Sequence, residues 1–339
     1  MERISIIDLV EQIPTEADAY AFMERLRWPD KPICPHCGSE AEHRFLAPEN
    51  GSSRRTRTGT LSQRRVWKCR DCKRQFSVIT NTPFHGSKVP VRTWLFVLFE
   101  MCANKNGIAA REIARKYRLT NKTAWFVAHR VRLAMENLPI AEPMRGTIVA
   151  DETFIGGDPL RMNRKTRRRW EGRDEDPVPV APGAARPNQH TAKTPVLALI
   201  DTNTGEARSK VITDVAGPTL RKAIANQVVM SGSTLMTDEG PQYNQIGREF
   251  LSHGAVNHHA GEYVRGSVTT NQAENFFSQL KRSLDGTHHH ISKTHLPRYL
   301  AEFDFRYSTR GLTDTQRMQR LMGQTANRRL SYKRVVGSY

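Results

Sequence analysis

Three acidic residues in the second half of the chain have the types and order of a site for divalent metal ions. Asp151 and Asp238 each follow an apolar run with the pattern of a β-strand, and Glu274 lies in a stretch with helical spacing. Strand ends in one sheet lie close together, so two aspartates there can share cations, and carboxylate oxygens suit Mg²⁺ or Mn²⁺. Such ions support phosphodiester chemistry, because one activates the attacking oxygen and another stabilises the leaving oxygen.

The segment that carries Glu274 predicts a helix with two distinct faces. At spacings of three, four and three, its polar stripe consists of Asn271, Glu274, Ser278 and Lys281. Its apolar stripe consists of Ala273, Phe277, Leu280 and Leu284. Two metal ions require anionic ligands, so we expect Glu274 to be the third ligand and Asn271 to be an auxiliary group. Asn271 would also suit the N-cap of this helix.

The order of the expected elements indicates how these residues come together. Apolar and alternating runs predict a strand that ends at Asp151-Glu152, a hairpin formed by 196–200 and 207–212, and a strand that ends at Asp238. Helices are expected at 217–229 and near 242–251, and the residues VNHH form a short last strand. This β-β-β-α-β-α-β-α order predicts an α/β fold over 145–310: a ribonuclease H-like mixed sheet with flanking helices.

Four of the five cysteines form two Cys-x-x-Cys pairs with 31 residues between them: Cys34, Cys37, Cys69 and Cys72. Four thiolates bind Zn²⁺ tetrahedrally and leave no open position, so the pairs predict a structural zinc ribbon over 15–85. Two unrelated redox motifs are the alternative interpretation. His36 and His43 are alternative ligands, and Cys102, in an apolar run, is expected to be a core thiol.

Residues 86–140 predict a helical DNA-binding segment. A helix is expected from about Val91, and the two that follow are separated by a short turn, with Thr120 or Asn121 as the cap of the second, as in a helix-turn-helix. From 103 to 133 there are eight Lys or Arg residues and one acid. The side chains expected to be exposed for reading a DNA groove are Lys122, His129 and Arg130. The alternative is an ordinary helical hairpin with a solvated basic face.

Basic residues also gather outside these elements. The stretch 50–65 is rich in Arg, Ser and Gly and predicts a mobile ribbon tip, where Arg55 and Arg57 either contact phosphates or are simply solvated. A disordered basic insert is expected over 158–193, and a basic tail over 311–339. Within the insert, the expected DNA contacts are Arg167 and Arg168.

The overall charge agrees with a nucleic-acid partner. Lys and Arg number 52 against 34 Asp and Glu, which gives a net charge of +18 and a pI near 10.1. Double-stranded DNA is the expected polyanion, and an anionic membrane surface is the alternative. No apolar run approaches the roughly 20 residues that span a bilayer, and the N-terminus lacks a signal-peptide layout. We therefore expect a cytoplasmic, nucleoid-associated protein with no membrane contact.

Taken together, these motifs resemble a known family. VADETFIGG, TDEG and TNQAENFFSQLKR, after a CPHCG…CRDC ribbon and a helical segment, are similar to DDE-type insertion-sequence transposases. The resemblance covers roughly 15–310 and is strongest to the group with a zinc ribbon and an ISXO-type transposase domain, first named from a Xanthomonas element. It implies a ribonuclease H fold, Mg²⁺ or Mn²⁺ dependence, binding to terminal inverted repeats, DNA cleavage and strand transfer, and at least a dimer in the synaptic complex.

The resemblance also implies roles for individual residues. It makes Asp151, Asp238 and Glu274 the catalytic metal ligands and Lys281 a contact to the DNA backbone. Both Glu and Asn occur at the third position in the family, so Asn271 is a second candidate there. No covalent protein intermediate is required, and the run His288–His290 is expected to flank the site or meet DNA.

Two other functions fit parts of this pattern. The protein could be a zinc-ribbon DNA-binding regulator whose ribonuclease H-like domain is inactive, but intact acids at all three positions favour an enzyme. It could also be a cellular nuclease or resolvase of the same fold. The DNA-reading segment near the N-terminus favours sequence-specific ends over branched or hybrid substrates.

Overall fold

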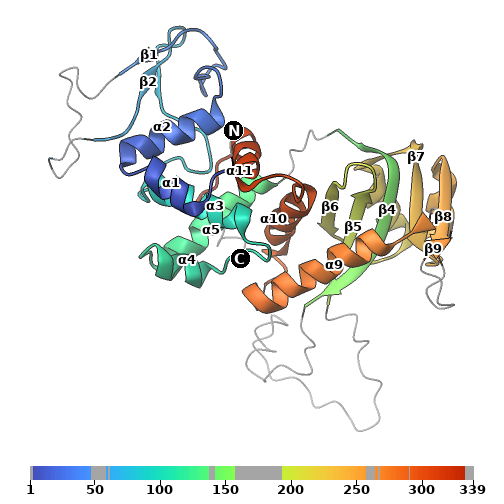
Figure 1. Ribbon diagram of the computed structural model, residues 1–339. Helices are drawn as coiled ribbons and strands as arrows, with labels where there is room; N and C mark the ends of the chain where they lie inside the picture. Colours follow the sequence, from blue (N-terminus) through green and yellow to red (C-terminus); the bar gives the residue numbers. More distant parts are fainter. Residues whose placement is uncertain are drawn as a thin grey trace, which may run out of the picture. The chain divides into compact units, whose positions relative to one another are not determined.

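The computed structural model describes residues 3–46, 59, 62–136, 142–156, 193–256, 264–265, 268–289 and 291–332. The chain forms two compact units (Figure 1). The N-terminal unit contains Met1–Leu138 and the returning segment Thr309–Tyr339. The sheet unit contains Pro139–Ser308.

The sheet unit is built around five strands in the order β6-β5-β4-β7-β8. The strands are β4 (Met144–Ile155), β5 (Thr194–Asp201), β6 (Ala207–Val211), β7 (Val228–Asp238) and β8 (Ser252–Val256). β5 pairs antiparallel with β4 and β6, whereas β7 pairs parallel with β4 and β8. The expected mixed α/β sheet, antiparallel first and parallel afterwards, is confirmed.

Helices cover both faces of this sheet. They are α7 (Gly217–Ala225), α8 (Tyr243–Ile246), α9 (Asn271–Ser283) and α10 (Leu296–Ser308). Along β4, Val149 packs in the layer under α9 and α10, whereas Ile148 and Ala150 pack in the layer under α7 and α8. Side chains alternate between the two faces of a strand, so an apolar run buries both faces. Short elements complete the unit: η3 (Gly247–Glu249), η5 (Leu284–His288), β9 (Val264–Arg265) and β10 (Val268–Thr269).

Three expected boundaries in the sheet unit are wrong. The last strand, expected at VNHH, begins earlier, because β8 (Ser252–Val256) pairs with β7 from Ser252 onward. β4 does not end at Asp151-Glu152, because β5 continues to supply antiparallel partners as far as the pair Ile155–Thr194. The helix expected to reach residue 229 ends at Ala225, since the chain turns there and enters β7 at Val228. Asp238 does end its strand, as expected.

The N-terminal unit combines helices with a small ribbon. Its helices are α1 (Ile6–Gln12), α2 (Glu16–Arg27), α3 (Val91–Ala103), α4 (Ala110–Lys116), α5 (Asn121–Met135) and α11 (Asp314–Gly323). Its strands β1 (Arg44–Phe45), β2 (Trp67–Lys68) and β3 (Gln75–Phe76) form an antiparallel sheet in that order. The Thr120 side chain accepts a hydrogen bond from the Thr123 N–H and so caps α5, one of the two caps expected.

Helix α11 lies within the stretch that the sequence indicated as a basic tail. Its residues Met318, Leu321 and Met322 are buried, and it packs on α2, α3 and α5. The Arg317 guanidinium donates to the carbonyl oxygen of Cys102 at 2.9 Å. At least 314–323 are therefore part of the packed N-terminal unit. Among the described residues, the helices are too short or too polar to cross a membrane.

Candidate active site and zinc centre

Asp151 and Asp238 occupy equivalent positions on adjacent parallel strands. Val149 of β4 pairs with Met236 of β7, and each aspartate lies two residues further along its strand. Val149 and Met236 both pack in the layer that α9 covers. Because side chains two apart share a face, both aspartates face the side of the sheet that α9 covers.

Helix α9 supplies the third acid on this same side. It contacts β4 and β5, and Figure 1 shows it lying across them. The apolar stripe is buried as expected, and Phe276 joins it by packing edge-on against Phe303 and Tyr307. The four residues of the polar stripe are exposed: Asn271, Glu274, Ser278 and Lys281. Glu274 lies in the first turn, where the helix dipole favours a negative charge.

Asn271 is not the N-cap residue of α9. Thr270 is the N-cap residue of α9, and Asn271 is the first residue of the helix. The backbone N–H of Asn271 donates to the Thr269 hydroxyl at 3.2 Å. An exposed Asn271 one turn before Glu274 is free of a capping function and lies on the stripe where a group auxiliary to the acids is expected.

Glu152 was not predicted as a site residue, although it directly follows Asp151. It lies on the opposite face of β4, where the hydroxyl of Tyr243 donates to its carboxylate. Burial raises the pKa of Glu152 to about 7, the bond from Tyr243 opposes that rise, and the nearby charges of Asp151 and Asp238 add to it. The sequence did contain a signal for Glu152, because strand alternation places this acid on the face of β4 opposite Asp151, among core residues.

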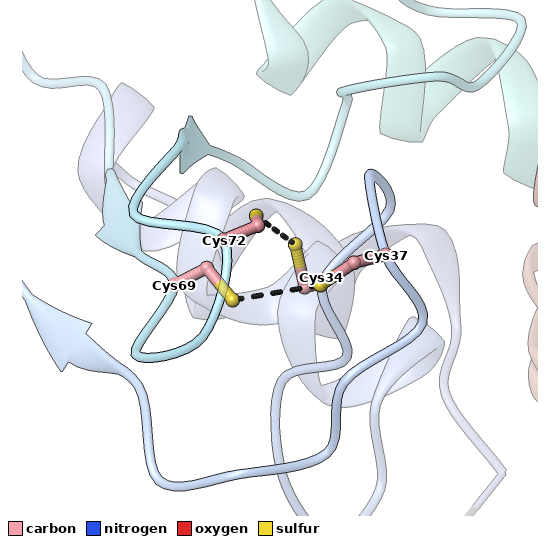
Figure 2. Close-up of side chains that lie close together, drawn as sticks. All are labelled: Cys34, Cys37, Cys69 and Cys72. Carbon is pink, nitrogen blue, oxygen red and sulfur yellow. Dashed lines mark hydrogen bonds between the residues drawn. The ribbon is translucent and has the colours of Figure 1, made fainter.

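The four paired cysteines converge at one point (Figure 2). Their sulfur atoms all lie within 4.8 Å of one another, and the Cys34–Cys72 and Cys37–Cys69 distances are both 3.7 Å. Zn–S bonds of about 2.3 Å at tetrahedral angles place sulfurs about 3.8 Å apart. The cluster therefore fits a structural zinc ion with four thiolate ligands.

The backbone of both knuckles supports this geometry. Gly38 and Lys73 each follow the second cysteine of a pair, and both have left-handed φ angles, of 73° and 60°. The histidines considered as alternative ligands are engaged elsewhere: the Nε2 atom of His36 bonds to the Gln75 carbonyl and that of His43 to the Ser39 carbonyl. Cys102 is fully buried, as expected for a core thiol.

The exposure expected along α5 is wrong for two of three residues. Lys122 is exposed, and its ammonium lies over the Tyr332 ring at 4.6 Å. His129 and Arg130 are only 0% and 5% exposed. The Arg130 guanidinium donates to the His85 carbonyl and lies over the rings of Trp94 and Phe126. Arg130 therefore packs inside the N-terminal unit.

Other basic side chains between residues 103 and 133 face solvent. They are Lys105, Arg111, Arg115 and Arg118, in addition to Lys122. Lys116 differs, because Glu100 and Glu112 neutralise it at 3.0 and 3.1 Å. The exposed basic residues therefore lie mainly on α4 and the turn after it. Helix periodicity alone did not predict this distribution.

Several predicted residues lie outside the described residues. These are Arg55, Arg57, Arg167, Arg168, His290 and nearly all of the basic insert. The His288 ring packs edge-on against Tyr299 with ring centroids 4.8 Å apart.

Comparison with known proteins agrees with this arrangement. A family model of the ISXO2-like transposase domain matches residues 143–308, and one of the transposase zinc-ribbon domain matches residues 14–75. The chain belongs to this transposase family. The two matched ranges together cover well over half of the chain and coincide with the sheet and the cysteine cluster. Membership associates the protein with mobile elements and implies DNA binding.

One relative is similar to this chain along most of its length. It is described as an uncharacterized protein in transposable element ISH50 of Halobacterium salinarum. It is 26% identical over 307 residues, which covers 88% of this chain and 92% of the relative. The similarity therefore extends over both units of this chain and is not confined to one domain.

Proposed function

We propose that this protein is an insertion-sequence transposase that binds the terminal inverted repeats of its element and catalyses DNA cleavage and strand transfer. The observation that carries the proposal is the equivalent placement of Asp151 and Asp238 on adjacent parallel strands, facing the layer of α9 and Glu274. The strand order and the helices on both faces support a ribonuclease H-like fold for this domain.

The donor set suits a hard divalent cation. Asp151, Asp238 and Glu274 would hold Mg²⁺ or Mn²⁺, and a pair of such ions would activate the attacking oxygen and stabilise the leaving one. In the proposed reaction, water attacks a phosphodiester at the element end, and the freed 3′-OH then attacks target DNA in the same site. Lys281, exposed two turns after Glu274, contacts the DNA backbone, and Asn271 orients a water or a ligand carboxylate.

DNA recognition is assigned to the N-terminal unit. The exposed cations of α4, of the α4–α5 turn and of the ribbon would neutralise phosphates. Arg55, Arg57, Arg167 and Arg168 remain proposed phosphate contacts. Two element ends must be joined before strand transfer, so at least a dimer is expected in the synaptic complex, acting at the nucleoid.

The test compares two variants of α9 in cleavage of a duplex that carries the element end with Mg²⁺. Glu274→Gln should abolish cleavage and retain end binding, because an amide does not supply the negative charge that two cations require. Asn271→Ala should leave measurable cleavage. Binding is checked separately by gel shift, and an EDTA arm should be inactive.

Two results would count against this assignment. Normal cleavage by Glu274→Gln with an inactive Asn271→Ala would move the third ligand to Asn271. Absence of cleavage by the wild-type protein, with intact end binding, would favour a DNA-binding regulator with an inactive domain.

A further inference from the structure

The pairing between β4 and β7 stops before the two aspartates. Its last pair is Val149–Met236, and both acids lie two residues beyond it. β4 continues to pair with β5, and β7 with β8, so each acid is held from its outer side. The spacing between Asp151 and Asp238 therefore needs another connection across the gap between their strands.

Glu152 and Tyr243 supply such a connection. Tyr243 is fully buried in the apolar layer formed with Ile246 and Leu220 on the α7–α8 side. Its hydroxyl donates to the carboxylate of Glu152, so an element that follows β7 is tied to a residue of β4. The bond joins α8 to β4 just beyond the point where the ladder between β4 and β7 ends.

Backbone hydrogen bonds extend this connection to both aspartates. The N–H of Glu152 donates to Oδ1 of Asp151 at 2.7 Å. The N–H of Tyr243 donates to the Gly240 carbonyl at 3.0 Å, and the N–H of Gly240 donates to Oδ1 of Asp238 at 3.1 Å. A continuous series of contacts thus leads from one carboxylate to the other through the opposite face of the sheet.

The position of Glu152 has a cost that packing alone does not explain. Its neighbours on this face of β4 and β5 are apolar: Ala150, Leu197 and Leu199. A carboxyl group placed in such a layer loses hydration, and an aliphatic residue there would stabilise the sheet more. A polar residue that lowers the stability of the fold is expected mainly where it contributes to a functional site.

We propose that Glu152 and Tyr243 are positioning residues that hold Asp151 and Asp238 at the spacing for shared divalent cations. The inference rests on the proposed function, since it assumes that the aspartates are metal ligands. Glu152 acts through Tyr243 and the backbone and is not itself a ligand. Its task requires a hydrogen-bond acceptor of the right length, not a negative charge.

The experiment is a titration of the metal-free, full-length protein with Mn²⁺, in which electron paramagnetic resonance measures the free ion. Tyr243→Phe, which only removes the hydroxyl, should raise the Kd for Mn²⁺ on the order of 10-fold or more. Glu152→Ala should do the same. Glu152→Gln should stay within about 3-fold of wild type, because its amide oxygen still accepts the bond from Tyr243.

A matched control is available in the other unit. The Tyr117 hydroxyl also donates to a glutamate, Glu100, at 3.2 Å, so Tyr117→Phe removes the same kind of bond in a unit that does not contain the aspartates. Its Mn²⁺ affinity should equal that of wild type. Circular dichroism at the titration temperature verifies that each variant is folded.

The outcomes separate this proposal from the proposed function. Wild-type affinity in Tyr243→Phe would overturn the positioning role. Loss in Glu152→Gln as severe as in Asp151→Asn would also overturn it, since Glu152 would then act through its charge as a ligand. Unchanged binding in Asp151→Asn and Asp238→Asn would instead refute the metal site itself, and the positioning role with it.

Discussion

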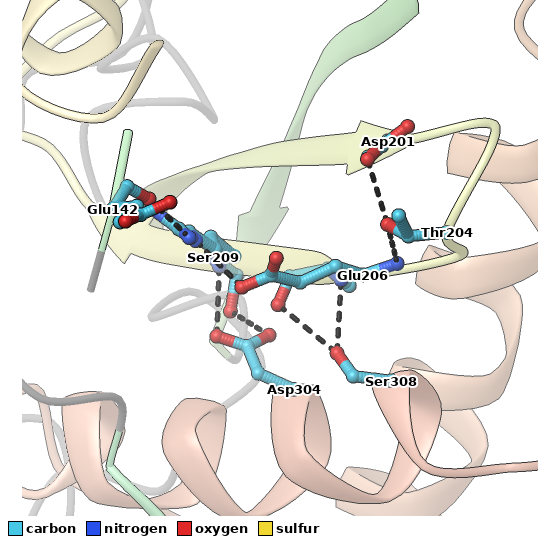
Figure 3. Close-up of polar contacts among 9 residues, drawn as sticks. Glu142, Asp201, Thr204, Glu206, Ser209, Asp304 and Ser308 are labelled. Carbon is cyan, nitrogen blue, oxygen red and sulfur yellow. Dashed lines mark hydrogen bonds and ion pairs between the residues drawn. The ribbon is translucent and has the colours of Figure 1, made fainter. Parts of the chain in front are cut away.

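At the scale of single residues, burial decides what each polar side chain does. Asp304 of α10 is almost completely buried, and it accepts hydrogen bonds from the backbone N–H and the hydroxyl of Ser209 on β6 (Figure 3). Nearby, the Ser308 hydroxyl accepts from the Ala207 N–H at 2.9 Å. These contacts attach α10 to the edge strand of the sheet with one acid and one hydroxyl.

Asp304 should make the stability of the sheet unit depend on pH. Burial raises its pKa to about 7, with a further contribution from Glu206, against the bonds from Ser209 and the charge of Arg208. The folded state therefore binds this proton more tightly than the unfolded state, in which the pKa is about 3.9. The free energy of unfolding should fall as pH rises from about 4 to about 7 and then level off.

Asp304→Asn should reduce this fall, because the side chain keeps its shape but no longer titrates. The measurement is urea unfolding at several pH values between 4 and 8, followed by circular dichroism. Glu152 titrates in the same range for the same reason, so part of the slope should remain. An unchanged slope would show that Asp304 is not buried as a protonated acid near neutral pH.

At the scale of elements, α5 carries basic residues in two different environments. Its buried face holds Arg130, and its exposed N-terminal turn presents Lys122. Helix α4 places further exposed cations before that turn. The two kinds of basic residue should respond differently to the same substitution.

Lys122→Ala should weaken DNA binding nearly equally for all sequences and lower the slope of log K against log salt by about 1, because it removes one phosphate contact. The stability of this variant should fall by about 1 kcal/mol or less, because only the exposed contact with the Tyr332 ring is lost. Arg130→Ala should instead destabilise the N-terminal unit by about 2 kcal/mol or more, since it leaves the His85 carbonyl without its donor and empties the space beside Trp94.

Salt-dependent fluorescence anisotropy and thermal unfolding distinguish these effects, with the exposed Arg111→Ala as a second surface variant. If Arg130→Ala kept full stability and lowered the slope of log K against log salt, Arg130 would instead be a DNA-contacting residue.

The zinc ribbon is an element that the metal should stabilise directly. Cys69→Ser should release about one equivalent of zinc and weaken folding or end binding, because a hydroxyl replaces one of four thiolates. Metal analysis after dialysis measures the loss. Cys102→Ala is the matched control. The Cys102 thiol is buried outside the cluster, so this variant should retain its zinc. Full zinc content in Cys69→Ser would refute the four-cysteine centre.

At the scale of the whole molecule, the chain leaves the N-terminal unit, forms the sheet unit and returns. The returning segment contributes α11 and two arginines that bond to helix ends: Arg317 to the Cys102 carbonyl, and Arg328 to the carbonyls of Leu133 and Glu136 at 2.6 Å. The last carbonyls of a helix lack partners within it, so these arginines complete α3 and α5.

A chain that stops after Arg310 should therefore have a less stable N-terminal unit, even though it keeps the ribbon and the helix-turn-helix-like segment. Lower thermal stability and weaker end binding are expected, because Met318, Leu321 and Met322 no longer cover α2 and α3. A chain that stops after Tyr332 retains α11 and should match wild type. Equal melting temperatures for both truncations would show that α11 is dispensable.

The sequence by itself determined the features that depend on residue type and short-range spacing. Two Cys-x-x-Cys pairs indicated a four-thiolate cluster, and the period of 268–282 identified both faces of α9. The alternation of strands and helices predicted the mixed sheet. These patterns are local because a helix or strand repeats its own geometry, whatever lies next to it.

Only the tertiary structure decided which polar residues became buried and which segments met. The period of α5 places Arg130 on a face, but Trp94 and His85, which come from other parts of the chain, bury it. The same holds for α11 and for the bond between Tyr243 and Glu152, 91 residues apart. Burial depends on the neighbours that long-range packing supplies, and no short window of sequence contains them.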